Sequence, residues 1–263
     1  MKVKIYDLTG KETGTTELPR VFETPYRPDV IKRAVLAQQS RRRQKYGSDP
    51  LAGKRTSAHY HGRRKYRFTM MNKELSRIPR IHGKGAGIFA YRARFAPHAV
   101  KGRQAHPPKS EKNWAQRVNK KELGLAIKSG IAASAMSENL KLRGHSAPSP
   151  CIFVDDFENI KKAKQLKKLL ENVMANEIKR TEKRKVRAGR GKMRNRRYSR
   201  KKGPLIVASK NCDVIKAAKN IPGIDAVPFQ NLNAELLAPG GQAGRLLILT
   251  KTCLQKLDEK FGE

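Results

Sequence analysis

Acidic residues are scarce in this sequence. The 263 residues contain 22 Asp and Glu against 59 Lys and Arg, which gives a formal net charge of +37 and a pI near 10.6. Self-repulsion on this scale disfavours a compact protein on its own. The charge balance therefore indicates a polyanionic partner.

Long apolar runs and cysteines are also few. No stretch approaches the about 18 consecutive apolar residues of a membrane span, and the first residues lack the apolar run of a signal peptide. The three cysteines, Cys151, Cys212 and Cys253, are far apart, and each lies beside apolar residues. We expect buried free thiols in a reducing cytoplasm and no association with a membrane.

Motifs for catalysis or cofactor binding are lacking. Asp155 and Asp156 follow an apolar strand, as a magnesium-binding pair would, but the sequence has no G-x-x-x-x-G-K-[ST] phosphate loop, so helix capping is the preferred interpretation. Gly83, Gly85 and Gly87 have a dinucleotide-like spacing without a strand before them or a helix after them. The histidines have no cysteine partners and no metal-ligand spacing. We therefore expect no catalytic residue, no metal, no cofactor and no enzymatic activity.

What the sequence has instead is a basic segment from residue 41 to residue 110. Between Arg41 and Lys109 it holds 19 Lys or Arg, two acids and five of the six histidines. Apolar residues do not recur at helical or strand spacing, which predicts a loop, and structureless loops of this length are usually functional or disordered. Glycines and seven aromatic residues are interleaved with the charge, namely Tyr46, Tyr60, Tyr66, Phe68, Phe89, Tyr91 and Phe95.

A second basic block, residues 180–203, holds 13 Lys or Arg and one acid. Arginine guanidinium groups bind phosphates bidentately, aromatic rings stack on unpaired bases, and glycines let the protein backbone approach phosphates closely. The combination favours folded RNA over B-form DNA. A disordered polybasic tail is the alternative, but both ends of the long segment are tied to one domain. The predicted RNA-binding residues are Arg41, Arg42, Arg43, Lys54, Arg55, His59, His61, Arg63, Arg64, Arg67, Arg103, His106, Lys109, Arg187, Arg190, Lys192, Arg194, Arg196, Arg197 and Arg200.

Outside these blocks, helix and strand patterns alternate. Residues 1–40 and 111–263 predict a single globular α/β domain with a mainly parallel sheet flanked by helices. Asn119 and Glu122 have capping-box spacing at the start of a helix to about residue 138. The expected strands are 2–6, 151–154, 205–208, 224–227 and 245–249, and the other expected helices are 29–39, 160–174, 213–220, 233–238 and 253–261.

Several ordered motifs carry a family resemblance. They are DPLAGKR at 49–55, RIPR at 77–80, GR at 102–103, AHPPK at 105–109, NKKE at 119–122, IAASA at 131–135, RAGRGK at 187–192, NIPG at 220–223, LAPGG at 237–241 and GRL at 244–246. Over nearly its whole length the chain resembles the universal large-subunit ribosomal protein four family in its archaeal form.

The resemblance implies a structural protein of the large ribosomal subunit in the cytoplasm, not a homo-oligomer. Its partners would be large-subunit ribosomal RNA, neighbouring large-subunit proteins including the one opposite at the tunnel constriction, and the nascent peptide. In that family an extended loop penetrates the RNA, and its tip helps to form the narrow part of the peptide exit tunnel. The implied tip, residues 77–94, contains Arg77, Arg80, His82, Lys84, Tyr91, Arg92 and Arg94.

Two other classes stay open on the residues alone. An RNA-modifying or phosphate-processing α/β enzyme could use a basic loop for its substrate, although no glycine-rich strand–helix turn offers a small-molecule site. A nucleoid or RNA-chaperone protein could bind without a fixed site. Stoichiometric association with large subunits would separate the structural role from both.

Overall fold

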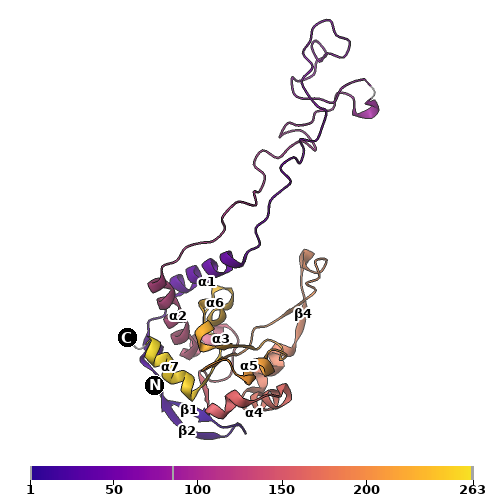
Figure 1. Cartoon of the computed structure of the whole chain (residues 1–263). Helices are drawn as coiled ribbons and strands as arrows, with labels where there is room; N and C mark the ends of the chain where they lie inside the picture. Colours follow the sequence, from indigo (N-terminus) through magenta and orange to yellow (C-terminus); the bar gives the residue numbers. More distant parts are fainter. Residues whose placement is uncertain (1, 85, 262–263) are drawn as a thin grey trace. The chain divides into compact units, whose positions relative to one another are not determined.

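The computed structural model describes residues 2–84 and 86–261, and the chain divides into two compact units (Figure 1). The first, called here the globular domain, comprises Met1–Arg42 and Ala115–Glu263. The second, called here the arm, comprises Arg43–Trp114. Gly85, one of the three glycines with dinucleotide-like spacing, lies outside the described residues.

A six-stranded sheet forms the centre of the globular domain, with strands in the order β2-β1-β3-β8-β6-β7. All neighbours are parallel except β1 and β2, which form an antiparallel pair at one edge. This confirms the predicted α/β fold with a mainly parallel sheet. The strands are β1 (Lys2–Tyr6), β2 (Glu12–Glu17), β3 (Cys151–Phe153), β6 (Leu205–Ala208), β7 (Asp225–Pro228) and β8 (Leu247–Thr250).

The three central strands are buried over their whole length because helices cover both faces of the sheet. Successive side chains of a strand point to opposite faces, so Ile206 and Ile248 pack with α4 (Ala163–Glu182) and α5 (Asp213–Ala218). Leu205 and Leu247 pack on the other face. That face is covered by α7 (Lys251–Phe261), α6 (Ala234–Leu237), α2 (Lys120–Ala135) and the 3-10 turn η1 (Arg20–Glu23).

Helix α1 (Pro28–Arg42) lies outside α2 and α6 and adds a further small core. Its buried Ile31 and Val35 meet alanines of those two helices. In α2, a Cβ on Gly130 would lie 3.3 Å from side-chain atoms of Leu237, so the small residues of this helix permit close packing as expected. The remaining elements of the domain are α3 (Ser137–Leu142), η3 (Asp155–Asn159), η5 (Phe229–Asn231) and η6 (Pro239–Gly241).

The second basic block is more ordered than a loop. Strands β4 (Arg184–Val186) and β5 (Tyr198–Arg200) form a separate antiparallel pair. The turn between them includes η4 (Gly189–Gly191). Helix α4 extends to Glu182, so residues 180–182 are helical. We call residues 183–203 the basic hairpin.

Several local predictions were wrong. The side chain of Asn119 makes no capping hydrogen bond, and Glu122 pairs instead with Arg33 at 3.0 Å. The helix predicted to residue 138 ends at Ala135, and α3 follows as a separate element. Asp155 caps α7 rather than the next helix along the chain, because its Oδ1 accepts from the amide of Thr252 at 2.8 Å.

Two further predictions differ from the structure, one about a polar strand and one about the burial of a cysteine. Strand β2 was not predicted, because its sequence ETGTTE has no apolar alternation; it is ordered by its backbone pairing with β1 and by cross-strand contacts such as Lys4 with Glu12 at 2.6 Å. Of the three cysteines, Cys151 and Cys253 are buried as expected, whereas Cys212 is half-buried. No helix among residues 2–84 and 86–261 has the length and apolar character needed to span a membrane.

Candidate nucleic-acid interface

Backbone hydrogen bonds, rather than a helix or a sheet, fold the arm. His59 and Arg80 form an isolated antiparallel bridge, and Arg80 forms another with Ala93. The regular structure among the described arm residues is one 3-10 turn, η2 (Gly87–Phe89). Buried apolar side chains there are few, namely Met70 and Ala96. The arm therefore has almost no core of its own, and its conformation depends on polar contacts.

The predicted tip residues fall into two groups. Arg80 is half-buried, and its Nη1 donates to the carbonyl of half-buried Tyr91 at 2.9 Å while its Nη2 donates to Ser76 Oγ at 2.6 Å. Arg94 donates to the carbonyl of Val100 at 2.5 Å. These arginines hold the arm together through hydrogen bonds within it. The exposed cations of the tip are Arg77, Lys84 and Arg92.

Three predicted histidines come together inside the arm. The ring centroids of His59 and His61 lie 3.7 Å apart, and those of His61 and His82 lie 4.6 Å apart. Burial, and then the neighbouring imidazoles, lower the pKa of His61. Its Nε2 is covered and has no partner among the described residues. His61 thus packs inward, although the sequence predicted an RNA contact, while His59 is exposed.

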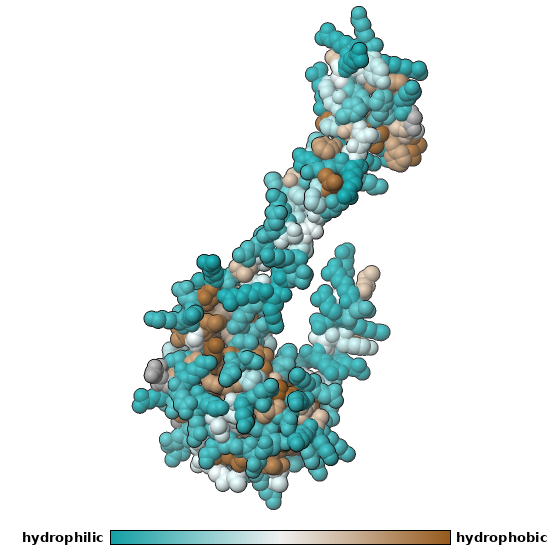
Figure 2. All heavy atoms as spheres, in the orientation of Figure 1, coloured by the Kyte–Doolittle hydropathy of each residue, from teal (hydrophilic) through white to brown (hydrophobic). Residues whose placement is uncertain are grey.

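Most of the other predicted residues of the arm are exposed. Within the described arm the one ion pair joins Arg55 to Asp49, so acids neutralise little of its charge. Arg103 is half-buried, and Arg42, at the end of α1, pairs with Glu235 of α6. Exposed in the arm are Arg43, Lys54, Arg55, Arg63, Arg64, Arg67, His106 and Lys109, and Arg41 and Arg42 at the end of α1 are exposed as well. Hydrophilic residues cover most of the arm and the hairpin in Figure 2.

The basic hairpin displays its cations around one aromatic ring. Arg184 and Arg197 lie 5.0 and 5.6 Å from the ring centroid of Tyr198, and Arg187 donates to its carbonyl at 3.1 Å. The predicted residues of this block are all exposed, and none of them forms an ion pair with an acid among residues 86–261. They are Arg187, Arg190, Lys192, Arg194, Arg196, Arg197 and Arg200.

A buried ion pair anchors the end of the hairpin, and no periodic pattern of residues points to it. Arg245 is 1% exposed, and its Nη2 donates to Asp225 at 2.6 Å while its Nε donates to the carbonyl of Gly203 at 2.8 Å. Lys202 pairs with the same carboxylate at 2.8 Å. Burial opposes ionisation of Asp225, but Lys202 and Arg245 outweigh it and lower its pKa.

A second buried group, on α4, holds the same end of the hairpin. Glu177 accepts from His145 at 2.9 Å and from the amide of Ser146 at 2.8 Å, and Arg180 lies 3.0 Å away. Burial opposes ionisation of Glu177, yet these partners lower its pKa. Arg180 also donates to the carbonyl of Lys202 at 3.2 Å. The last two residues of the hairpin are therefore tied to buried charges of the domain, which positions its exposed cations.

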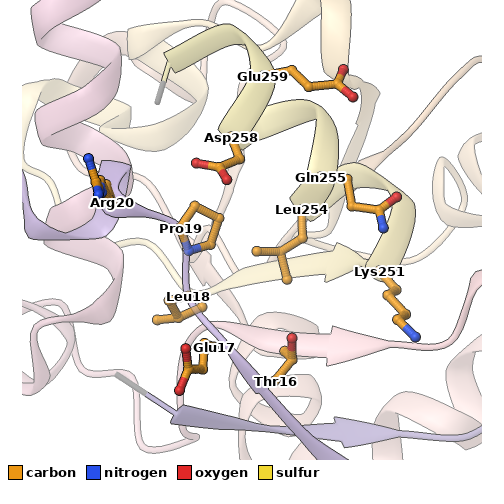
Figure 3. Close-up of a pocket in the computed structure, with 10 residues that line it drawn as sticks. All are labelled: Thr16, Glu17, Leu18, Pro19, Arg20, Lys251, Leu254, Gln255, Asp258 and Glu259. Carbon is orange, nitrogen blue, oxygen red and sulfur yellow. The ribbon is translucent and has the colours of Figure 1, made fainter. Parts of the chain in front are cut away.

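A hollow of about 1120 Å³ on the globular domain has a different character. It lies between the β2–η1 connection and α7 (Figure 3). Three acids (Glu17, Asp258 and Glu259) and two bases (Arg20 and Lys251) line it together with apolar residues that include Leu18 and Leu254. Because acids outnumber bases in this groove, its charge does not favour a polyanion. Among residues 2–84 and 86–261 no group of three or more His, Cys, Asp or Glu is arranged to hold a metal ion.

Comparison with known proteins identifies the family. Residues 16–260 match the model of the ribosomal protein L4/L1 family. The chain belongs to this family. Archaeal relatives called "Large ribosomal subunit protein uL4" are similar to it over nearly their full length. The relative from Nanoarchaeum equitans is 45% identical over 99% of this chain and 98% of its own. Those from Archaeoglobus fulgidus and Methanosphaera stadtmanae are 43% and 40% identical, over 98% and 99% of this chain and 99% and 97% of their own.

Membership of the L4/L1 family confirms the resemblance seen in the motifs. It is a family of structural, non-enzymatic components of the ribosome, which agrees with the expectation that the chain is not an enzyme. The relatives are archaeal large-subunit proteins, and the ribosome is cytoplasmic, so the predicted location follows from the family.

Proposed function

We propose that this protein is a structural constituent of the large ribosomal subunit that binds large-subunit ribosomal RNA through its arm and its basic hairpin. The observation that carries the proposal is the separation of charge. Two segments display exposed cations with almost no acidic partners, whereas the acids of the globular domain pair with cations of that domain or line a groove. Family membership supports the same role.

Counterion release would supply much of the affinity. Each Lys or Arg that neutralises a phosphate weakens binding by about 0.7–0.9 log units per log unit of salt. Between them the two basic blocks contain 32 Lys or Arg. Because the arm has almost no core, it would take its final form as the RNA folds around it, and binding would supply the ordering free energy.

The arm tip, residues 77–94, would contribute to the wall of the peptide exit tunnel, facing the nascent peptide and a second ribosomal protein. Arg77, Lys84 and Arg92 are its exposed cations. Ile88 is 79% exposed, and Arg92 lies 5.3 Å from the ring centroid of half-exposed Phe89. We propose that these residues, rather than Arg80 and Arg94, make the contacts outside the arm.

Co-sedimentation tests the proposed role. A tagged full-length chain in an archaeal host should travel with large subunits in stoichiometric amount and stay bound in moderate salt. A free soluble pool, or equal association with bulk DNA and unrelated RNA, would contradict the proposal.

A deletion of residues 70–96 tests the role of the tip. The globular domain should still fold, because the deletion lies within the arm and removes no residue of the domain's core. The chain should still join the subunit. The tunnel constriction should change, as judged by the accessibility of nearby RNA to chemical probes. Loss of helical circular dichroism would show instead that the arm is needed for folding.

A further inference from the structure

The two ends of the arm form a hollow that the proposed charge contacts do not explain. The amide of Ser48 donates to the carbonyl of Pro108 at 3.0 Å, which joins the two segments. A Cβ on Gly47 would lie 2.6 Å from the amide nitrogen of Ser110, so only glycine permits this approach. Beside this contact lies a hollow of about 860 Å³ lined by Tyr46 and Trp114, among others. That volume lies within the range of small-ligand sites.

An aromatic pair forms one wall of the hollow. The rings of Tyr46 and Trp114 are stacked at 15°, with centroids 5.8 Å apart. Trp114 is half-buried, and its Nε1 is covered without a partner among the described residues. Tyr46, by contrast, is 48% exposed. Trp114 is thus the more buried member of the pair, and the ring of Tyr46 is the accessible one.

Cations surround this pair. The guanidinium of Arg43 lies 3.9 Å from the ring centroid of Trp114, and Nζ of Lys112 lies 4.4 Å from it. Lys109 and His106 line the hollow as well. A cationic occupant would be repelled, while a group that combines a flat ring with a negative charge would be attracted.

A nucleotide has both of these properties. Bases stack on exposed aromatic rings with little sequence preference, and Lys and Arg attract the phosphates. Glu111 and Gln104 also line the hollow and could accept hydrogen bonds from the amino groups of a base. An acidic peptide would satisfy the cations but would leave the ring of Tyr46 unused.

We propose that the hollow between Tyr46 and Lys109 binds one unpaired nucleotide of RNA, with its base stacked on Tyr46 and its phosphate beside Lys109 and Lys112. This inference rests on the proposed RNA-binding function and adds a base-recognising site to it. Such a site would add a preference for an unpaired base, since phosphate contacts position a protein on its RNA but read no base.

Trp114, the single tryptophan of the sequence, gives a direct probe. The full-length protein is titrated with a short single-stranded oligoadenylate and with an abasic oligonucleotide of equal length. The base-containing strand should quench the tryptophan fluorescence and bind at least about tenfold more tightly than the abasic strand, because stacking is lost in the latter.

Variants separate stacking from charge. Tyr46→Ala should remove most of the tenfold preference, and Tyr46→Phe should retain it, while circular dichroism verifies that both variants are folded. Lys109→Ala should weaken binding of both strands equally. The site is disproved if the two strands bind wild-type protein equally, if Tyr46→Ala keeps the preference, or if an acidic peptide quenches the fluorescence and displaces the strand. Failure of both strands to bind would overturn the RNA-binding function itself, a distinguishable result.

Discussion

Nη2 of Arg245 lies 2.6 Å from Oδ2 of Asp225, and the arginine is 1% exposed. The same guanidinium donates to the carbonyls of Gly203, Pro204 and Leu236. One buried cation therefore ties the last residue of the basic hairpin to β7 and α6. It is the only fully buried arginine among residues 2–84 and 86–261.

Substitution of Arg245 should destabilise the globular domain strongly. Arg245→Ala removes the donor to three carbonyls and leaves the carboxylate of Asp225 with Lys202 alone, and loss of one partner of a buried pair typically costs about 3–5 kcal/mol. Urea unfolding followed by circular dichroism would measure this loss. As a matched control, Lys216→Ala removes an exposed cation 3.8 Å from Asp213, and the free energy of unfolding should change by less than about 1 kcal/mol. A small effect of Arg245→Ala would show that the pair does not anchor the hairpin.

Stability should fall in acid partly because of Glu177. Its partners make its pKa lower in the folded chain than the ordinary value of 4.5. The unfolded chain therefore binds the proton more readily, so the stabilisation is complete above about pH 4.5 and is lost as the pH falls through the folded-state pKa.

Glu177→Gln should lower stability at neutral pH and flatten this decline in urea unfolding measured from pH 7 downward. The exposed Glu171, 3.7 Å from Lys167, provides the control, and Glu171→Gln should leave the decline in place. An equal decline in wild type and Glu177→Gln would show that Glu177 does not cause the loss of stability in acid.

The central strands could be predicted from the sequence, whereas the anchoring charges could not. A short continuous apolar segment such as Leu205–Ala208 predicts a strand that is buried on both faces. Glu177 and His145 are 32 residues apart, and no local pattern joins them. Strand β2 escaped prediction because backbone pairing with β1 can order a polar segment.

The same contrast holds for the candidate interface. Composition identified the two basic blocks, because charge density is a property of the sequence alone. It could not separate Arg80, which donates inside the arm, from Arg92, which is exposed, since both are arginines in the same segment. The pairing of Tyr46 with Trp114 needed the fold as well, because 68 residues separate them.

Arg80 should matter for the order of the arm, and Arg92 should not. Arg80→Ala removes donors to Tyr91 and Ser76, so amide hydrogen exchange near Ile81 and Arg94 should become faster in the free protein. Arg92→Ala removes an equal charge from an exposed position and should leave exchange unchanged. Equal rates in wild type and Arg80→Ala would show that the backbone bridges hold without this side chain.

The exposed arginines of the hairpin should set the salt dependence of RNA binding. Replacing Arg194, Arg196 and Arg197 with Ala should reduce the slope of log affinity against log salt by about 0.7–0.9 for each lost phosphate contact. Filter binding to large-subunit RNA at several salt concentrations would measure the slope. Lys251→Ala, in the acidic groove, should leave it unchanged. Equal slopes for the triple variant and wild type would place the hairpin away from phosphates.

Crosslinking in intact subunits tests the central claim most directly. Ultraviolet crosslinks between this protein and large-subunit ribosomal RNA, mapped by mass spectrometry of the attached peptides, should concentrate in residues 43–114 and 183–203. Peptides of α7 and β2, which line the acidic groove, should carry few. Crosslinks confined to the globular helices, with none from the arm or the hairpin, would contradict the account.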